Sequence, residues 1–396
     1  MTEIETLVSE QNPQWSDTSY LPTETFWFKR HAFSIIKSWL EKRFVLAISG
    51  LRRIGKSSLM RQIVGDLISK GKGKRCLYFS FEKIQLKREP ELLREIINYY
   101  LKNILEEKPH ELKKQTYFFL DEIQNIPHWA EIVKSYYDQN ENFKFLVSGS
   151  NSLFVQKKAQ EALAGRIIEF NLYPFSFREY LELVYPSYKV EFKNRSWLTT
   201  ANLEILGGRF EKYLRFGQFP EIIGQKLNPD QARQYLETVE EKIIFNDLPR
   251  IFKVSHPEIL SLILDQVKNS PGQRIEYQNI ANDAGLDQRT VSKYFVYLEK
   301  GFLVFLCRNF GKKPLKALRV ARKAYLSSVN LAPDAPLPLL VENYFFNFWR
   351  QRGFEVYFQK DQEVDFVAVN KKREIVLNEV KYQKNVEEKD LRNMKD

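Results

Sequence analysis

Short, almost wholly apolar runs alternate with segments of helical periodicity in the first half of the chain. The runs lie at residues 44–48, 76–79, 116–120 and 143–147, and each has the length of a strand. Continuous apolar runs are typical of parallel strands that are covered by helices on both faces. The intervening segments repeat apolar residues at helical spacing. This half is therefore predicted to be an α/β domain with a parallel sheet.

The second half of the chain has a different pattern. Residues 257–300 contain three short helical segments, and two of them, 277–283 and 288–299, flank a turn at Gly285. A short helix, a glycine turn and a longer helix are the pattern of a helix-turn-helix. Residues 301–310 are then expected to form the strand pair of a wing. A last group of elements is predicted as a helix at 339–352 and strands at 355–358, 364–369 and 374–381.

These patterns divide the chain into five segments. A polar, acidic arm at the start is expected to be loosely held, and a helical lid or linker is expected to separate the α/β domain from the winged helix. The predicted segments are the arm at 1–25, the α/β domain at 26–174, the helical region at 175–245, the winged-helix domain at 246–310 and a C-terminal α/β domain at 311–396.

Composition narrows the classes of protein that the chain can belong to. The 396 residues carry a net charge of +11, which favours an anionic partner such as nucleic acid or a nucleotide. Cys76 and Cys307 both lie in apolar runs, which argues against a disulfide-stapled secreted protein and a cysteine-ligated zinc site. No run reaches the roughly 18 apolar residues of a membrane span. We therefore expect a cytoplasmic protein with no membrane segment.

The sequence between the first apolar run and the next helical segment matches the phosphate-loop pattern G-x-x-x-x-G-K-[ST]. Lys56 is expected to reach the β- and γ-phosphates of ATP, and the Ser57 hydroxyl to bind Mg²⁺. The alternative, a glycine turn beside a surface lysine, is disfavoured by the strand and helix on either side. The residues predicted to bind ATP are Gly50, Leu51, Arg52, Arg53, Ile54, Gly55, Lys56, Ser57 and Ser58.

The apolar run at 116–120 ends in two carboxylates, Asp121 and Glu122. A buried strand rarely ends in this way unless a cation or hydrogen-bond donors satisfy the charges. We expect Asp121 to hold the Mg²⁺ and Glu122 to orient or deprotonate the attacking water. A solvated strand end is the alternative, and the phosphate loop upstream disfavours it, because a nucleotide site needs both parts.

Two further positions are candidates for contacts with the γ-phosphate. Ser150 and Asn151 follow the run at 143–147, and a simple turn explains them equally well. Arg166 precedes another apolar stretch and is predicted to act as an arginine finger, in cis or from a neighbouring subunit. A surface arginine is the competing interpretation. Action from a neighbouring subunit would require an oligomer, which the sequence leaves open.

Several of these segments resemble a large prokaryotic family of AAA-like P-loop ATPases with a C-terminal, nuclease-like domain of unknown function. The resemblance covers most of the chain, and it implies Mg²⁺-dependent hydrolysis of ATP. Leu51 and Ser57 stand where the family often has proline and threonine, and Gln218 replaces a glycine. The matching segments are 50–58 (GLRRIGKSS), 118–124 (FFLDEIQ), 147–150 (VSGS), 164–166 (AGR), 172–179 (LYPFSFRE) and 216–221 (FGQFPE).

A strongly basic stretch follows the helix-turn-helix pattern. No acidic residue lies between Glu299 and Asp334, whereas surfaces that are merely solvated normally mix both signs of charge. The start of the second helix is expected to meet base edges or phosphates of DNA, and the wing to contact phosphates. A winged helix that only packs against the ATPase domain is the alternative. The predicted DNA-binding residues are Gln288, Arg289, Thr290, Lys293, Lys312 and Lys313.

The C-terminal segment brings together residues that resemble the core of PD-(D/E)XK nucleases. Strand alternation predicts Glu379 and Lys381 on one face, with Asp365 on the adjacent strand and Glu342 on the preceding helix. The resemblance implies a second metal site built from these residues. The alternative is an amphipathic strand edge with a Glu–Lys pair. Val364 replaces the proline of the motif, and an incomplete nuclease-like domain is left open.

The sequence thus predicts an α/β fold class: a P-loop NTPase domain with a parallel sheet, followed by a winged-helix domain and a nuclease-like α/β domain. The leading hypothesis is an AAA-like ATPase that uses ATP and Mg²⁺ and acts on or with DNA. Two alternatives come from other classes. One is an ATP-gated DNA nuclease, and the other is a DNA-binding protein that senses ATP without hydrolysing it.

Overall fold

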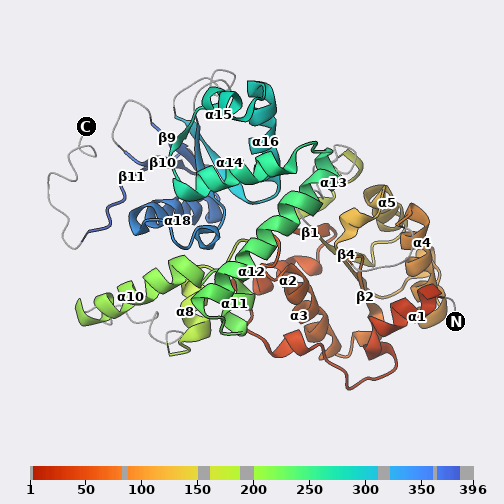
Figure 1. The fold of residues 1–396 in the computed structure, drawn as a ribbon. Helices are drawn as coiled ribbons and strands as arrows, with labels where there is room; N and C mark the ends of the chain where they lie inside the picture. Colours follow the sequence, from red (N-terminus) through yellow and green to blue (C-terminus); the bar gives the residue numbers. More distant parts are fainter. Residues whose placement is uncertain are drawn as a thin grey trace. The chain divides into compact units, whose positions relative to one another are not determined.

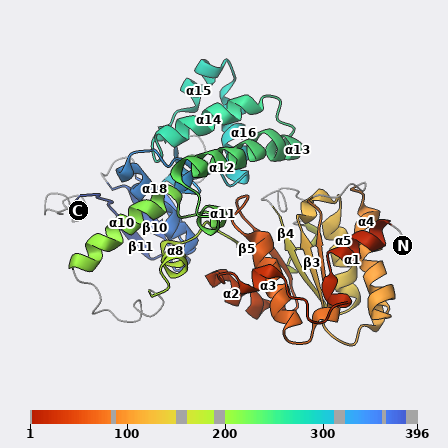
Figure 2. The same ribbon diagram turned by 60° about the horizontal axis from the view of Figure 1, so that its bottom comes forward.

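The computed structural model describes residues 3–82, 88–149, 161–187, 200–310, 322–359 and 364–383. The chain divides into two compact units, Met1–Leu172 and Tyr173–Asp396, each with its own sheet (Figures 1 and 2). Among the described residues, no helix combines the length and apolar character that crossing a membrane requires.

The first unit is built on a five-stranded sheet with the order β2-β3-β4-β1-β5. Every neighbouring pair is parallel, which confirms the predicted parallel α/β sheet. The four predicted strands are present, each running one residue further at its carboxyl end than the apolar run. The strands are β1 (Val45–Ser49), β2 (Cys76–Ser80), β3 (Thr116–Asp121), β4 (Phe143–Ser148) and β5 (Ile167–Asn171).

Helices cover both faces of this sheet, so its central strands are fully buried. One face packs with α1 (Glu3–Glu10), α4 (Pro90–Tyr99) and α5 (Trp129–Gln139) in a single apolar cluster. On the other face, α3 (Lys56–Ile68) contacts β2, β3 and β4, and it lies beside α2 (His31–Leu40). The continuous apolar runs follow from this double cover, because neither face of the sheet meets water.

The start of the chain is tied down, which corrects the expectation of a loosely held arm. The Asn12 side chain is buried, and its amide bonds both backbone groups of Tyr78 on the edge strand β2, at 2.7 and 2.8 Å. Trp15 and Gln14 donate to the carbonyl of Cys76 on the same strand. These side chains satisfy backbone groups that an edge strand otherwise leaves unpaired.

The second unit combines helices with a six-stranded mixed sheet of order β11-β10-β9-β7-β8-β6. Its strands are β6 (Arg274–Ile275), β7 (Val304–Asn309), β8 (Arg322–Leu326), β9 (Glu355–Phe358), β10 (Phe366–Val369) and β11 (Ile375–Asn378). Its helices are α8 (Phe177–Val184), α10 (Thr200–Phe216), α11 (Pro220–Gly224), α12 (Pro229–Glu241), α13 (Leu248–Phe252), α14 (Pro257–Asn269), α15 (Tyr277–Ala284), α16 (Gln288–Lys300) and α18 (Leu337–Gln351).

The helix-turn-helix segment has the local geometry that its sequence predicts. Gly285 ends α15 with φ +66°, a left-handed conformation that favours glycine. The Asp287 side chain then caps α16 by accepting from the backbone N–H groups of Arg289 and Thr290, at 2.8 and 3.0 Å. This cap satisfies two of the donors that the first turn of a helix leaves free.

The predicted strand pair at 301–310 is wrong. That segment holds the single strand β7, whose antiparallel partner is β8 at Arg322–Leu326. On its other side β7 pairs in parallel with β9, so one sheet continues across the predicted boundary at residue 310. The apolar pattern of this one strand was interpreted as a hairpin, because its true partner strand is distant in the sequence.

Candidate nucleotide site at the carboxyl edge of the parallel sheet

The predicted phosphate loop joins the end of β1 to the start of α3. Residues 50–55 form the loop, and Lys56, Ser57 and Ser58 open the helix. Gly50 has φ +149°, and a Cβ there would lie 2.2 Å from the carbonyl oxygen of Leu172. Gly55 precedes the helix with φ +93°. Only glycine fits both positions, because one lacks space for a side chain and the other is left-handed.

The loop holds its own lysine. Nζ of Lys56 lies 3.0 Å from the carbonyl oxygens of both Gly50 and Leu51, and the residue is buried. The ammonium group therefore sits inside the curve of the loop, at the amino end of a 13-residue helix. The positive end of the helix and an ammonium together favour the binding of an anion at this loop.

Two arginines support the loop, one from outside the motif and one from within it. Arg30, which is buried, donates from Nη1 to the carbonyl of Ile54 at 3.2 Å. Arg52, within the loop, forms an ion pair with Glu82 at 2.7 Å, just after β2. Sequence reasoning missed Arg30, because a single arginine before a helix gives no signal until the fold brings it to the loop.

Asp121 ends β3 as a buried carboxylate. One oxygen accepts from the Ser148 hydroxyl at the end of β4, and the other from the Tyr78 hydroxyl on β2 at 3.1 Å. Both donors are neutral, so these contacts leave the negative charge of the carboxylate uncompensated. Sequence reasoning also missed Ser148 and Tyr78, whose roles depend on the order of the strands.

Glu122 follows directly in a left-handed conformation with φ +52°. Burial raises the pKa of its carboxyl group, and the charge of Asp121 raises it further. The charges of Lys56 and Arg52 lower this pKa in part, as does a hydrogen bond from Gln124. The structure therefore places both Lys56 and Asp121 close enough to Glu122 for their charges to act on its carboxyl group.

The donor set fits a magnesium ion. Mg²⁺ prefers oxygen ligands and is usually held by one or two carboxylates together with phosphate oxygens and water. The carboxylate of Asp121 and the hydroxyl of Ser57 are such ligands, at the end of β3 and in the first turn of α3. A buried carboxylate that accepts from two neutral hydroxyls, at the end of β3, is an arrangement that a divalent cation would complete.

Arg166 lies where the parallel strands begin, at the end of the sheet opposite to the phosphate loop. It immediately precedes β5, which runs parallel to β1, and its carbonyl accepts from the N–H of Val45, the first residue of β1. The phosphate loop follows the last residue of β1, and a strand of five residues spans about 17 Å. The cis form of the predicted arginine finger is therefore incompatible with this position. Ser150 and Asn151 lie outside the described residues.

In the second unit, the start of α16 presents polar side chains to the surface. Gln288, Arg289 and Lys293 are exposed, and Thr290 is half-buried with its hydroxyl 2.6 Å from Asp287. Lys312 and Lys313 lie outside the described residues. Elsewhere in the basic stretch, Arg322 is buried and Lys323 is held by Glu342 at 3.3 Å, so these two are not surface cations.

The C-terminal carboxylates are each held by different partners. Glu342 accepts from the Tyr325 hydroxyl at 2.7 Å, and Asp365 from the backbone N–H of residue 380 at 2.6 Å. Glu379 is paired with Lys381, but both lie beyond the end of β11, so strand alternation does not account for their pairing. Within the described ranges, no group of three or more acidic, histidine or cysteine side chains could hold a metal ion. The second metal site therefore stays a prediction.

Two separate segments of the chain match two different protein-family models. Residues 42–181 match the family model described as an AAA domain, and residues 207–335 match a domain of unknown function. An uncharacterized protein of Haemophilus influenzae is 25% identical over 339 residues, which cover 82% of this chain and 79% of that protein. An uncharacterized protein of Methanocaldococcus jannaschii is 26% identical over 391 residues, covering 89% and 80%.

Solved structures give weaker matches. The Aeropyrum pernix ORC1 protein in complex with DNA is 12% identical with a TM-score of 0.35, over 82% of this chain and 96% of that one. AMPPCP-bound DnaA from Aquifex aeolicus is 14% identical with a TM-score of 0.31, over 73% and 92%. Over residues 42–181, which contain the phosphate loop, Asp121 and Glu122, the chain is similar to AAA-type ATPase domains.

Proposed function

We propose that the first unit binds ATP with Mg²⁺ and hydrolyses it. The observation that carries this proposal is the convergence of Lys56, Asp121 and Glu122 beside a loop whose two glycines could not be replaced. A structural turn would not need a buried ammonium, a buried carboxylate and a second, half-buried carboxylate at the same end of a sheet. The match of residues 42–181 to an AAA domain supports the same function.

Each part of the site has a role in this reaction. The loop amides and Lys56 hold the β- and γ-phosphates, and Ser57 and Asp121 hold the metal ion. When bound, Mg²⁺ neutralises part of the charge on the phosphates. Glu122 accepts a proton from a water molecule as its oxygen attacks the γ-phosphorus. The bond from that phosphorus to the bridging oxygen breaks, ADP leaves with the electron pair, and inorganic phosphate is released.

Phosphate release from ATP tests this proposal directly. We expect the purified chain to release phosphate from ATP when Mg²⁺ is present and to lose this activity when the metal is chelated. A protein that binds ATP but releases no phosphate would overturn hydrolysis and would match the alternative of a DNA-binding protein that senses ATP. A protein that does not bind ATP under any condition would overturn the whole proposal.

We also propose that the second unit contacts DNA as a winged helix. The order α14, β6, α15, α16, β7, β8 supports this, with α16 capped by Asp287 and exposing Arg289 and Lys293 near its start. The first residues of the second helix in a helix-turn-helix are those that reach the major groove. The net charge of +11 would add non-specific attraction to phosphates.

The salt dependence of DNA binding tests this second proposal. Each phosphate contact contributes about one unit to the slope of log affinity against log salt concentration. Arg289→Ala and Lys293→Ala should each reduce the slope by about one unit, while Arg250→Ala, an exposed arginine on α13, should leave it unchanged. Equal slopes for all three variants would place any DNA contact elsewhere.

Nuclease activity of the second unit is the weaker proposal. The side chain of Glu379 is nearly buried, and its Oε2 atom has no hydrogen-bond partner, which would suit a ligand at that atom. The carboxylates of Glu342 and Asp365 are nevertheless satisfied by other donors. Cleavage of single-stranded or branched DNA by the full chain with Mg²⁺ or Mn²⁺, with or without ATP, would support this activity. No cleavage under any of these conditions would overturn it.

A further inference from the structure

Tyr78 lies in the middle of β2 and points to the α3 face of the sheet. Its register partner on β3 is Phe119, two residues before Asp121, so its side chain lies on the same face as the Asp121 carboxylate. The Tyr78 hydroxyl donates to Oδ2 of Asp121 at 3.1 Å, and the residue is only 4% exposed.

The tyrosine is held from several directions. The guanidinium of Arg61 on α3 lies 4.6 Å from the centre of its ring, and Arg61 is paired with Glu24 at 3.7 Å. Its backbone N–H and carbonyl are both bonded to the side chain of Asn12, which is 1% exposed. A residue fixed by its ring, its hydroxyl and its backbone has one available orientation, and that orientation aims the hydroxyl at Asp121.

We propose that Tyr78 is a positioning residue that fixes the Asp121 carboxylate and thereby sets the affinity of the site for Mg²⁺. This inference rests on the proposed nucleotide function. A carboxylate oxygen has two lone pairs, so the bond from Tyr78 leaves one on Oδ2 for a cation or its water. Partners that orient a metal ligand commonly change metal affinity by 10- to 100-fold when they are removed.

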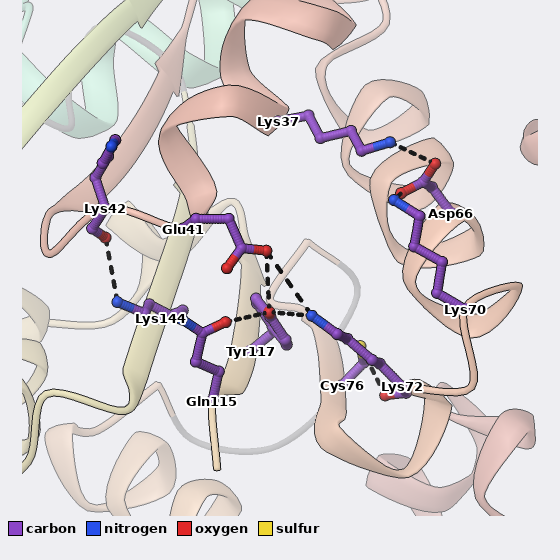
Figure 3. Close-up of polar contacts among 10 residues, drawn as sticks. All are labelled: Lys37, Glu41, Lys42, Asp66, Lys70, Lys72, Cys76, Gln115, Tyr117 and Lys144. Carbon is purple, nitrogen blue, oxygen red and sulfur yellow. Dashed lines mark hydrogen bonds and ion pairs between the residues drawn. The ribbon is translucent and has the colours of Figure 1, made fainter.

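Tyr78→Phe separates this role from packing. The variant keeps the ring under Arg61 and the backbone bonds to Asn12, and it removes only the hydroxyl. A matched control is Tyr117→Phe on the neighbouring strand β3. Tyr117 lies on the same face of the sheet as Asp121, but near the amino end of β3, whereas Asp121 ends that strand. Its hydroxyl accepts from Lys72 at 3.0 Å and donates to Gln115 at 2.8 Å (Figure 3).

Figure 3 shows the polar network around the control residue, Tyr117. The network around Tyr117 also includes Glu41, 3.5 Å from its hydroxyl, and Lys144 donates nearby to the carbonyl of Lys42 at 3.3 Å. These groups lie where the strands begin, four residues or about 13 Å along β3 from Asp121. Loss of the Tyr117 hydroxyl therefore disturbs a polar network on the same face of the sheet without touching the Asp121 carboxylate.

The test measures binding of a non-hydrolysable ATP analogue to the full chain, with and without Mg²⁺, by calorimetry. In the wild type and in Tyr117→Phe, we expect Mg²⁺ to tighten binding by the same factor. In Tyr78→Phe, affinity without Mg²⁺ should be unchanged and the tightening by Mg²⁺ should shrink about tenfold or more. Equal tightening in all three proteins, or a wild type that binds the analogue equally well without Mg²⁺, would overturn the inference.

Two measurements keep this test interpretable. Thermal melting of each variant without nucleotide shows whether the fold is retained, and Mn²⁺ binding to the nucleotide complex, followed by electron paramagnetic resonance, reports metal affinity directly in any variant that folds. A wild type that binds no analogue at all would overturn the proposed nucleotide function. If the wild type binds the analogue with an affinity that depends on Mg²⁺, and Tyr78→Phe shows the same dependence, only the proposed role of Tyr78 is overturned.

Discussion

Nε of Arg166 lies 3.1 Å from Oδ1 of Asp138, at the edge of the sheet where the parallel strands begin. The phosphate loop follows the other end of the same sheet. This ion pair is more than one-third exposed on both sides, so it contributes little to stability. An arginine in this place can stabilise the transition state of phosphoryl transfer only in the site of a neighbouring copy.

Arg166→Ala should therefore leave ATP affinity unchanged and lower hydrolysis by about 10³-fold, the loss typical of a missing arginine finger. Mixing this variant with Lys56→Ala should restore part of the activity. In the mixture, a copy that lacks Lys56 still carries Arg166. It can supply this arginine to the nucleotide site of a neighbouring copy that lacks Arg166 but keeps Lys56. Full hydrolysis by Arg166→Ala alone would show that Arg166 is a surface arginine paired with Asp138.

Glu122→Gln should lower hydrolysis by about 10²- to 10⁴-fold, because the amide cannot accept the proton of the attacking water. ATP binding should remain, since Lys56 and the loop amides are untouched. Gln124→Ala, which removes a side chain that bonds Glu122, is the control and should cost far less. Equal activity of Glu122→Gln and the wild type would remove Glu122 from the reaction.

The rate of hydrolysis should also depend on pH through Glu122. Burial raises the pKa of this carboxyl group, so the folded site binds a proton at a higher pH than an ordinary glutamate, whose pKa is about 4.3. The base is active when it is deprotonated. The hydrolysis rate should thus be high at neutral pH. On acidification it should fall at a pH above about 4.3, the pKa of an ordinary glutamate. A rate that is flat down to the acid unfolding of the protein would contradict this assignment.

A partly buried pair of a glutamate and a lysine in the second unit allows a prediction about stability. Glu240 on α12 bonds Lys268 on α14 at 2.8 Å, beside a cavity of about 310 Å³. Burial raises the pKa of Glu240 to about 7. Because the folded value exceeds the unfolded value of about 4.3, the contribution of this group to stability is fully present below pH 4.3 and is lost as the pH rises through 7.

Glu240→Gln should remove this pH dependence. Relative to the wild type, the variant should gain stability between pH 5 and pH 8, by at most about 3 kcal/mol. Thermal unfolding at the two pH values measures the difference, and Glu241→Gln, at the exposed last residue of α12, is the control. An identical difference at pH 5 and pH 8 would mean that Glu240 is charged throughout this range.

Features that depend on neighbouring residues could be predicted from the sequence. The phosphate loop is read from one short segment, and the four strands from runs that must be apolar because helices cover both faces. β5 was not predicted as a strand, because it lies at the sheet edge, keeps every residue partly or fully exposed, and includes Glu169 and Asn171. Its pattern therefore lacks the continuous burial of the other four.

Features that depend on the order of the strands could not be predicted. Tyr78 and Ser148 meet Asp121 only because β2 and β4 flank β3, and Asn12 is recognisable as a side chain that satisfies β2 only once β2 is known to be an edge. The wing was misassigned for a related reason. Nothing between 301 and 310 shows that β7 pairs with residues beyond 321 and with β9.

The affinity of the chain for ATP, compared between the wild type and Lys56→Ala, tests the central claim most directly. Lysine to phosphate is a charge-assisted contact worth about 1.5–3 kcal/mol, so the variant should bind ATP roughly 10- to 150-fold more weakly in equilibrium binding. Lys70→Ala, which removes a lysine just beyond the opposite end of α3, should bind ATP as the wild type does. ATP binding of equal strength in the wild type and Lys56→Ala would contradict the account.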